Sequence, residues 1–167
     1  MAADRRRTVV TAIAVVQLLA LALWAGGLLA LGAIVAPIVF RVVPAPTNAD
    51  AMTLVFGRFD AVAIVCAAVA LVAEAAFAAT AGRGKVTRLD LARGLCLVVA
   101  AGLAIAIGAW LSPGIQALHH AGAVRHVGEA GLALERLHHL AETFAKGAVA
   151  LIVASFTLSV AKVARPL

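Results

Sequence analysis

Charged residues are scarce in this chain. Asp, Glu, Lys and Arg make up 13% of its 167 residues, whereas hydrophobic residues make up 64%. An average soluble domain has roughly a quarter charged residues. A soluble core of this size could not bury so much apolar surface. The shortage of charge therefore argues against a soluble globular protein and indicates a membrane protein.

Several chemical signatures are missing as well. The two cysteines, Cys66 and Cys96, have no CxxC or other zinc-type spacing. Their expected depths in neighbouring helices differ by roughly 10 Å, which is too far for a disulfide, so we expect them to pack as small residues. The sequence has no nucleophile–base pair, no glycine-rich nucleotide loop and no catalytic pair of carboxylates. We therefore expect that the protein is not an enzyme.

Long apolar runs dominate what is present. They are Thr8–Phe40, Ala61–Ala81, Leu89–Leu111 and Phe144–Ala161. A helix that spans a bilayer needs about 20 apolar residues at 1.5 Å each. The first three runs reach that length, and the fourth reaches it if its helix begins near Leu140. We predict an all-α, antiparallel bundle of four transmembrane helices in one domain, with helices over about 9–40, 58–81, 89–111 and 138–162.

The net charge of +6 is unevenly distributed. Basic clusters precede the first helix, follow the fourth, and lie between the second and third (Arg83, Lys85, Arg88 and Arg93), whereas the other two connections are nearly neutral or acidic. Positive clusters at alternate ends indicate orientation in a membrane. We expect a multi-pass protein of a bacterial inner membrane with both termini and the middle loop in the cytoplasm. The basic residues are expected to meet anionic lipids rather than nucleic acid.

Small residues recur at helical spacing on two of the runs. On the first run, Ala22, Gly26 and Ala30 form one row and Gly27 and Ala33 lie on a neighbouring row; on the third, Gly94 and Gly102 belong to a row that ends at Trp110. Small residues let helices approach closely in lipid. We expect these rows to mark helix contacts, either within the bundle or with a second copy or a partner membrane protein. Trp110 is expected at the outer interface, and Pro37 is expected to bend or end the first helix.

The expected outer side collects all five histidines. Imidazoles and carboxylates together bind transition metals, and Glu135, His138, His139 and Glu142 share one side of a helix. One hypothesis is a metal site formed by His119, His138, His139 and Glu142. The alternative is a solvated polar helix start in the headgroup layer. A third hypothesis is a haem held between His119 or His120 and His138 or His139.

Polar residues inside the expected bilayer are few. Glu74 lies about two turns from the cytoplasmic end of the second helix, and Gln17 and Ser155 or Ser159 are expected at a similar depth. Lys146 is expected to pair with Glu142 or to extend to the interface. A charge in lipid is costly, so such residues face the bundle. Glu74 is expected either to serve as a proton or cation site or to form a hydrogen-bonded clasp with Gln17 and a serine.

The motifs resemble a known family. They are Leu18–Gly27, Ala36–Phe40, Phe56–Phe59, Trp110–Leu118 and Arg136–Leu140. In this order they are similar to bacterial domain-of-unknown-function membrane proteins of the DUF4149 type, related to transmembrane protein 205. His138 matches a histidine of the family's last helix, whereas the positions after it differ. The resemblance implies four membrane helices, and the eukaryotic relative's link with platinum resistance suggests metal handling or efflux.

Three functional hypotheses follow. The first is a transport or resistance module for a metal ion or small cation, with the outer histidines as a binding site and Glu74 as an inner relay. The second is a structural or partner-binding subunit of a membrane complex, docked through the small-residue faces of the first and third helices. The third is a redox protein that binds haem or quinone.

Overall fold

The computed structural model describes residues 2–81 and 87–163, and every regular element in those ranges is a helix. The first span comprises α1 (Ala2–Leu29), a π-helical segment η1 (Ala30–Val35) and α2 (Ala36–Val42). The second is α3 (Thr47–Ala81). The third comprises α4 (Arg88–Ala106), the π-helical segment η2 (Ile107–Leu111) and α5 (Ser112–His120), and the fourth is α6 (Gly128–Val163). All four are long and apolar enough to cross a membrane, which confirms the predicted all-α fold.

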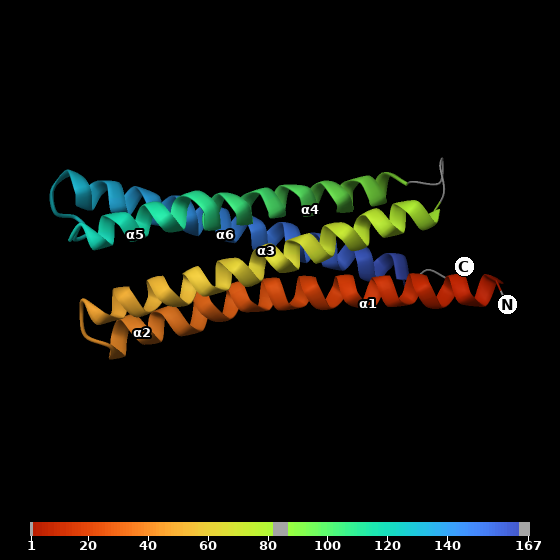
Figure 1. Cartoon of the computed structure of the whole chain (residues 1–167), viewed down its shortest axis with the longest axis horizontal. Coiled ribbons are helices and arrows are strands. Elements are labelled where there is room, and N and C mark those ends of the chain that lie inside the picture. Colours follow the sequence, from red (N-terminus) through yellow and green to blue (C-terminus); the bar gives the residue numbers. More distant parts are fainter. Residues whose placement is uncertain (1, 82–86, 164–167) are drawn as a thin grey trace.

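The spans form two antiparallel hairpins (Figure 1). One hairpin joins α1, η1 and α2 to α3, and the other joins α4, η2 and α5 to α6; α1 also packs on α6, and α3 on α4. We call the end that carries the N-terminus the base, and the end that carries the turns at 43–46 and 121–127 the tips. The two tips lie apart in Figure 1, and α2 packs against η1 and α3.

Helices extend further toward the tips than the sequence predicted. α3 continues beyond the predicted span of about 58–81 and begins at Thr47, and α6 begins at Gly128 rather than near 138. Pro37 does not end the first helix, which continues to Val42. A proline ring crowds the carbonyl four residues earlier. For Pro37 and Pro113 those carbonyls lie in η1 and η2, so a π-helical turn absorbs each proline and the helix goes on.

The core is built from a few large side chains among alanines. Leu21, Trp24, Leu97 and Ile152 are almost completely buried, and alanines of α3 and α4 pack between them. Alanines let the helix axes approach closely in lipid. Both cysteines are free, and Cys66 belongs to this core, as expected for a small packing residue.

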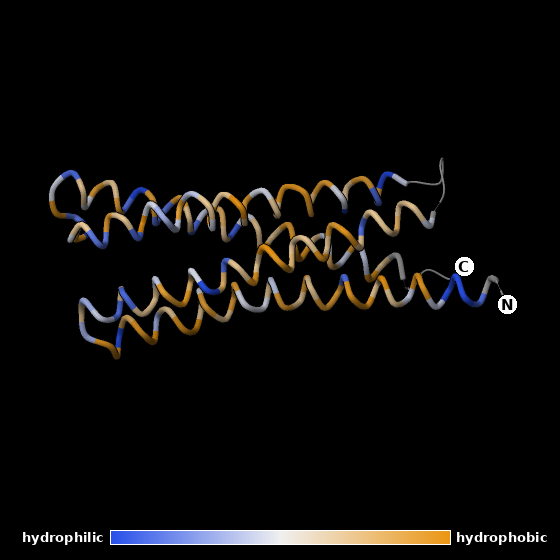
Figure 2. Tube along the Cα trace, in the orientation of Figure 1, coloured by the Kyte–Doolittle hydropathy of each residue, from blue (hydrophilic) through white to orange (hydrophobic). Residues whose placement is uncertain are grey.

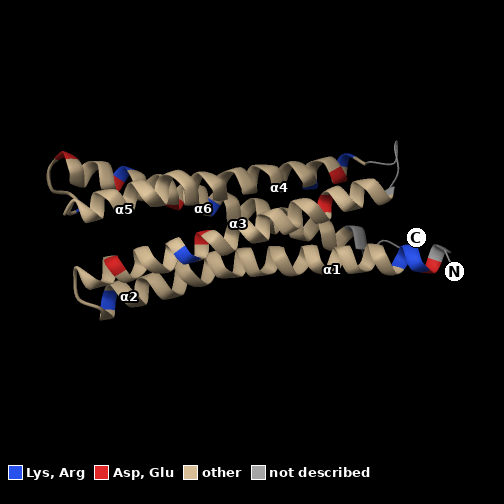
Figure 3. Cartoon of the chain, in the orientation of Figure 1, with Lys and Arg blue, Asp and Glu red and all other residues tan. Residues whose placement is uncertain are grey.

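Polar and aromatic markers define a slab of bilayer thickness. At the base, Arg6 donates a hydrogen bond to the carbonyl of Thr80, and Arg88 opens α4. On α3, Arg58 lies about 22 residues before Thr80, and on α4 the exposed Trp110 lies about 22 residues after Arg88. At 1.5 Å per residue, each separation is roughly 33 Å. That distance matches the thickness of a hydrocarbon core. Figures 2 and 3 show the mostly apolar, charge-poor stretch between the two levels.

The tips therefore project beyond the slab. α1 continues through η1 and α2 for 13 residues after Leu29, to Val42, which is about 20 Å. Large apolar side chains stay exposed on this projecting part, including Ile34, Ile38, Val42 and Leu54. Tilting of the spans shortens the projection along the membrane normal.

Candidate functional site

A buried ion pair joins α3 to α4 near the base. Arg93 donates from Nε and Nη2 to the two carboxylate oxygens of Glu74, each at 2.8 Å. The Arg93 side chain is 3% exposed and that of Glu74 is 16% exposed. Two parallel bonds between a guanidinium and a carboxylate form the strongest type of side-chain pairing. A charge inside lipid is costly, and here each partner offsets the charge of the other.

The position of Arg93 corrects the sequence analysis, which grouped it with the basic residues of the middle loop. α4 begins at Arg88, so Arg93 lies more than one turn inside the helix and points into the bundle. Phe77 and Asp90 complete its surroundings: the guanidinium carbon lies 5.2 Å from the centre of the Phe77 ring, and Nη2 lies 3.6 Å from a carboxylate oxygen of Asp90. The ring contributes a cation–π contact.

A signal for this pair was present in the sequence. Glu74 and Arg93 lie at similar distances on either side of the connection between α3 and α4. In an antiparallel hairpin, residues equidistant from the turn lie at the same depth. A buried carboxylate on one arm should therefore have prompted a search for a cation on the other.

Gln17 and two serines extend the pair to the remaining spans. Gln17 of α1 is fully buried, and its Nε2 donates to Glu74 at 3.0 Å and to the carbonyl of Ala70 at 3.4 Å. Ser159 of α6 donates to Gln17 Oε1 at 3.5 Å and to the carbonyl of Ser155 at 2.8 Å. These bonds place Gln17, Glu74 and Ser159 at one depth in the bundle. Ser155 Oγ is buried and has no hydrogen-bond partner in the described part of the chain.

These contacts make a clasp of Gln17, Glu74, Arg93 and Ser159, with one residue from each span. Glu74 accepts three hydrogen bonds, two of them from a cation. Its charge is therefore compensated within the protein. A carboxylate in this state stabilises the bundle and is poorly placed to bind a cation in transit.

A second polar contact lies close to the level of Arg58 and was not foreseen. Ser112, at the start of α5, donates to Asp60 of α3 at 2.6 Å. A Cβ atom at Gly108 would lie 3.3 Å from Cβ of Asp60, so this glycine lets α3 approach η2 closely. The contact fixes the two hairpins to each other at the height where their tips begin to separate.

The four predicted metal ligands are divided among different contacts. The rings of His119 and His138 meet edge to face with centres 5.9 Å apart. His139 lies 3.6 Å from Glu135, which is also 3.0 Å from His126. Glu142 pairs with Lys146 at 2.7 Å, as predicted for that lysine. Within residues 2–81 and 87–163, no group of three or more His, Cys, Asp or Glu side chains is arranged to hold a metal ion.

His138 nevertheless has an open donor or acceptor position. Its Nε2 atom is buried and has no hydrogen-bond partner among the described residues. Two imidazoles in contact could supply at most two ligands, which is fewer than a transition-metal site in a protein uses.

The predicted rows of small residues do not form one continuous contact surface between helices. Gly27, which belongs to the second row predicted on the first span, faces Phe59 of α3, whereas Ala22, Gly26 and Ala30 of the first row are exposed. On α4, Gly94 lies near Glu74 and Gly102 is exposed. The predicted rows are thus only partly used inside the bundle.

The fold and the clasp define a multi-pass membrane protein whose four spans are joined by a buried polar clasp around one ion pair. The chain belongs to the family described as "Domain of unknown function (DUF4149)", whose profile matches residues 19–124. The matched range contains Glu74 and Arg93. No curated protein and no solved structure matches the chain.

Proposed function

We propose that the protein is a non-catalytic, partner-binding subunit of a complex in a bacterial inner membrane, with both termini in the cytoplasm. One observation carries this proposal: an exposed face of the first span runs from inside the slab into the projecting tip. Its residues are spaced four apart, and they are Gly26, Ala30, Ile34 and Ile38. We also propose that this family is related to transmembrane protein 205.

The chemistry of this face suits a partner helix. A Cβ atom at Gly26 would meet nothing within 4 Å, so the glycine has no packing role in the chain. Glycine in a helix costs roughly 1 kcal/mol relative to alanine, and close approach of another helix offsets that cost. Ile34 and Ile38 are 58% and 55% exposed above the slab, where an apolar surface is typical of an interaction site.

The partner face can be tested by the size of the complex in mild detergent. Gly26→Leu and Ile38→Asp are expected to convert a larger assembly to the single chain, since each removes close contact without touching the clasp. Gly102→Leu is the matched control, because Gly102 is also exposed and has nothing within 4 Å of its Cβ position. Wild type that runs as a single chain, or equal loss in Gly102→Leu, would contradict the proposal.

The proposed orientation has a separate test. Reporter fusions after Gly84 and Pro166 should report the cytoplasm, and fusions after Ala49 and Gly122 the opposite side, because the sequence concentrates basic residues before the first span, between the second and third, and after the fourth. A cytoplasmic signal at Gly122 would overturn the four-span topology.

A metal-handling function is the second candidate, favoured by the contact of His119 with His138 and by the unpaired Nε2 of His138. Calorimetric titration with zinc or copper should show one site that is lost in His119→Ala and His138→Ala and weakened by acid, because a metal binds only the deprotonated form of its ligands. His120→Ala is the control, because His120 is exposed on the same helix. Binding that is indifferent to which histidine is removed would eliminate this candidate. Removal of His139 or Glu142 should have smaller effects, because both already pair elsewhere.

A further inference from the structure

An exposed ion pair lies on the outer surface of α6 and takes no part in the clasp. Lys146 Nζ lies 2.7 Å from Glu142 Oε1, and the two side chains are 75% and 57% exposed. By contrast, Arg93 and Glu74 of the clasp are buried between helices. Charged side chains within a membrane are rare and usually mark functional sites. An outward-facing pair at this place therefore points to a ligand outside the bundle.

A contact between α6 and α4 gives the depth of the pair. A Cβ atom at Gly147 would lie 3.5 Å from Cδ1 of Leu103. Leu103 precedes Trp110 by seven residues, so Gly147 lies about 10 Å inside the slab edge that Trp110 marks. Counting back along α6 at 1.5 Å per residue, the backbone of Lys146 lies about 9 Å inside that edge and the backbone of Glu142 about 3 Å inside it.

Both charges reach toward the headgroup layer. Helical side chains point toward the N-terminus of their helix, which for α6 is the end at the tip. The long side chain of Lys146 thus brings its ammonium to the carboxylate of Glu142, one turn nearer the tip. The cation approaches this level from the hydrocarbon side, and the anion approaches it from the headgroup side.

The pair carries two opposite charges and no net charge. The contact between them uses one of the three donors of the ammonium and one of about four acceptor positions of the carboxylate. Both groups are exposed, so each can bind a further partner. The two charges largely cancel for a simple anion or cation, whereas a zwitterion of matching order meets an opposite charge at each end.

We propose that Glu142 and Lys146 bind the headgroup of a zwitterionic phospholipid that ends in a primary ammonium, as in phosphatidylethanolamine. In that headgroup the phosphate lies next to the glycerol and the acyl chains, and the ammonium is outermost. Lys146, which comes from the deeper position, meets the phosphate, and Glu142 meets the ammonium. Ala150 and Val153 are exposed on the same side of α6, four and seven residues deeper than Lys146, and give an acyl chain an apolar surface.

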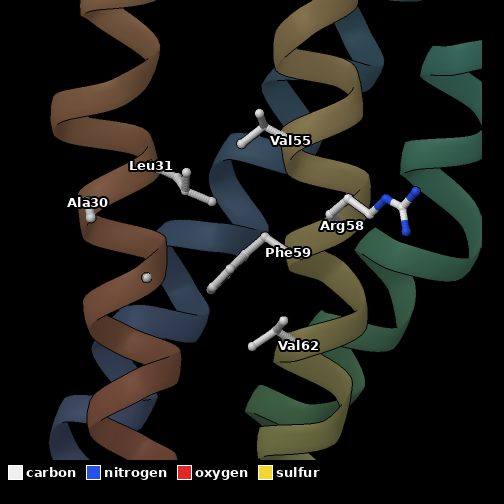
Figure 4. A pocket seen from close by; sticks show the side chains of 7 residues that line it. Ala30, Leu31, Val55, Arg58, Phe59 and Val62 are labelled. Atoms are coloured by element: carbon white, nitrogen blue, oxygen red, sulfur yellow. The ribbon is translucent and has the colours of Figure 1, made fainter.

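Arg58 provides a comparison at similar depth. The contact between Gly108 and Asp60 puts it at the level of Trp110. Figure 4 shows Phe59 and Val62 turned toward the first span and the guanidinium of Arg58 turned toward the third. Arg58 forms no ion pair within residues 2–81 and 87–163. It can attract a phosphate, but it has no carboxylate paired with it to receive a headgroup ammonium.

Native mass spectrometry of the detergent-purified chain tests the site, with phosphatidylethanolamine, phosphatidylcholine or phosphatidylglycerol added. Wild type should retain one phosphatidylethanolamine and bind the other two lipids more weakly, because choline has no N–H donor and the glycerol headgroup has no cation. Lys146→Gln and Glu142→Gln should each weaken binding about tenfold, since each removes a charge-assisted contact. Arg58→Gln is the matched control and should bind phosphatidylethanolamine as wild type does.

Exchange of the two charges tests their vertical order. The double variant Glu142→Lys with Lys146→Glu keeps an ion pair and the net charge, but it places the cation outermost. Its preference for phosphatidylethanolamine over the other two lipids should be lost. A double variant that keeps the wild-type preference would show that the order of the charges does not match a headgroup.

Other results would also overturn the proposal. Equal binding of the three lipids, or equal losses in Lys146→Gln and Arg58→Gln, would indicate a general attraction of phosphate to cations. Unchanged binding in both Glu142→Gln and Lys146→Gln would show that the pair is self-contained. Displacement of the lipid by inorganic phosphate would assign the contact to the anion alone. Thermal unfolding identifies any variant that fails to fold. The proposed partner face lies on the first span, so these variants should leave assembly in mild detergent unchanged.

Discussion

Arg93→Leu is expected to destabilise the protein by about 3–5 kcal/mol, because removing one partner of a buried pair leaves the charge of Glu74 uncompensated. Thermal unfolding in detergent would measure the loss. The double variant Glu74→Leu with Arg93→Leu should recover most of it, since apolar residues in place of both partners leave no buried charge. An Arg93→Leu protein as stable as wild type would show that the pair is solvated in the native state.

The contacts of Glu74 in the clasp predict different stabilities for two substitutions at this position. Glu74→Gln removes the charge but keeps an oxygen that can accept from Arg93 or Gln17, whereas Glu74→Lys places a second cation beside Arg93. We therefore expect the lysine variant to unfold at a clearly lower temperature than the glutamine variant. Equal stability of wild type and Glu74→Lys would place residue 74 in water or among headgroups.

Gly27→Ile is expected to cost about 1–3 kcal/mol, the range for overpacking a core. A Cβ atom at residue 27 would overlap the ring of Phe59, which lies across the contact between α1 and α3. Gly102→Ile is the matched control, because that glycine is an exposed helix residue outside the proposed partner face and has nothing within 4 Å of its Cβ position. Unfolding temperatures of the two variants would be compared in detergent, where oligomer contacts are weakened.

Phe59→Ala in the Gly27→Ile background separates steric overlap from a backbone effect. If the clash is the cause, truncating the ring should restore part of the lost stability. If both isoleucine variants lose the same amount, helix propensity rather than contact with Phe59 accounts for the change.

Much of the candidate site could be predicted from the sequence, because the depth of a residue in the bilayer follows from the number of residues between it and the end of its helix. Each helical residue adds 1.5 Å, so Gln17, Glu74 and Ser159 were assigned to one layer and do meet. Arg93 was missed because it follows a run of basic loop residues, and where α4 begins decides whether it is in the loop or the bundle. Three of the four predicted metal ligands, His138, His139 and Glu142, were expected on one side of a helix, yet their contacts depend on neighbours such as Glu135 and Lys146.

The sequence by itself determined the four spans, the all-helical class and the layer that holds the clasp. Hydropathy sums over many residues of one segment, so it is robust to local errors. Only the tertiary structure decided that Arg93 pairs with Glu74, that Gly27 faces Phe59 while Gly26 faces outward, and that the helices continue through Pro37 and Pro113. These features depend on rotation about each helix axis and on contacts between spans. A shift of one residue turns a side chain by about 100°, and hydropathy counts do not resolve that angle.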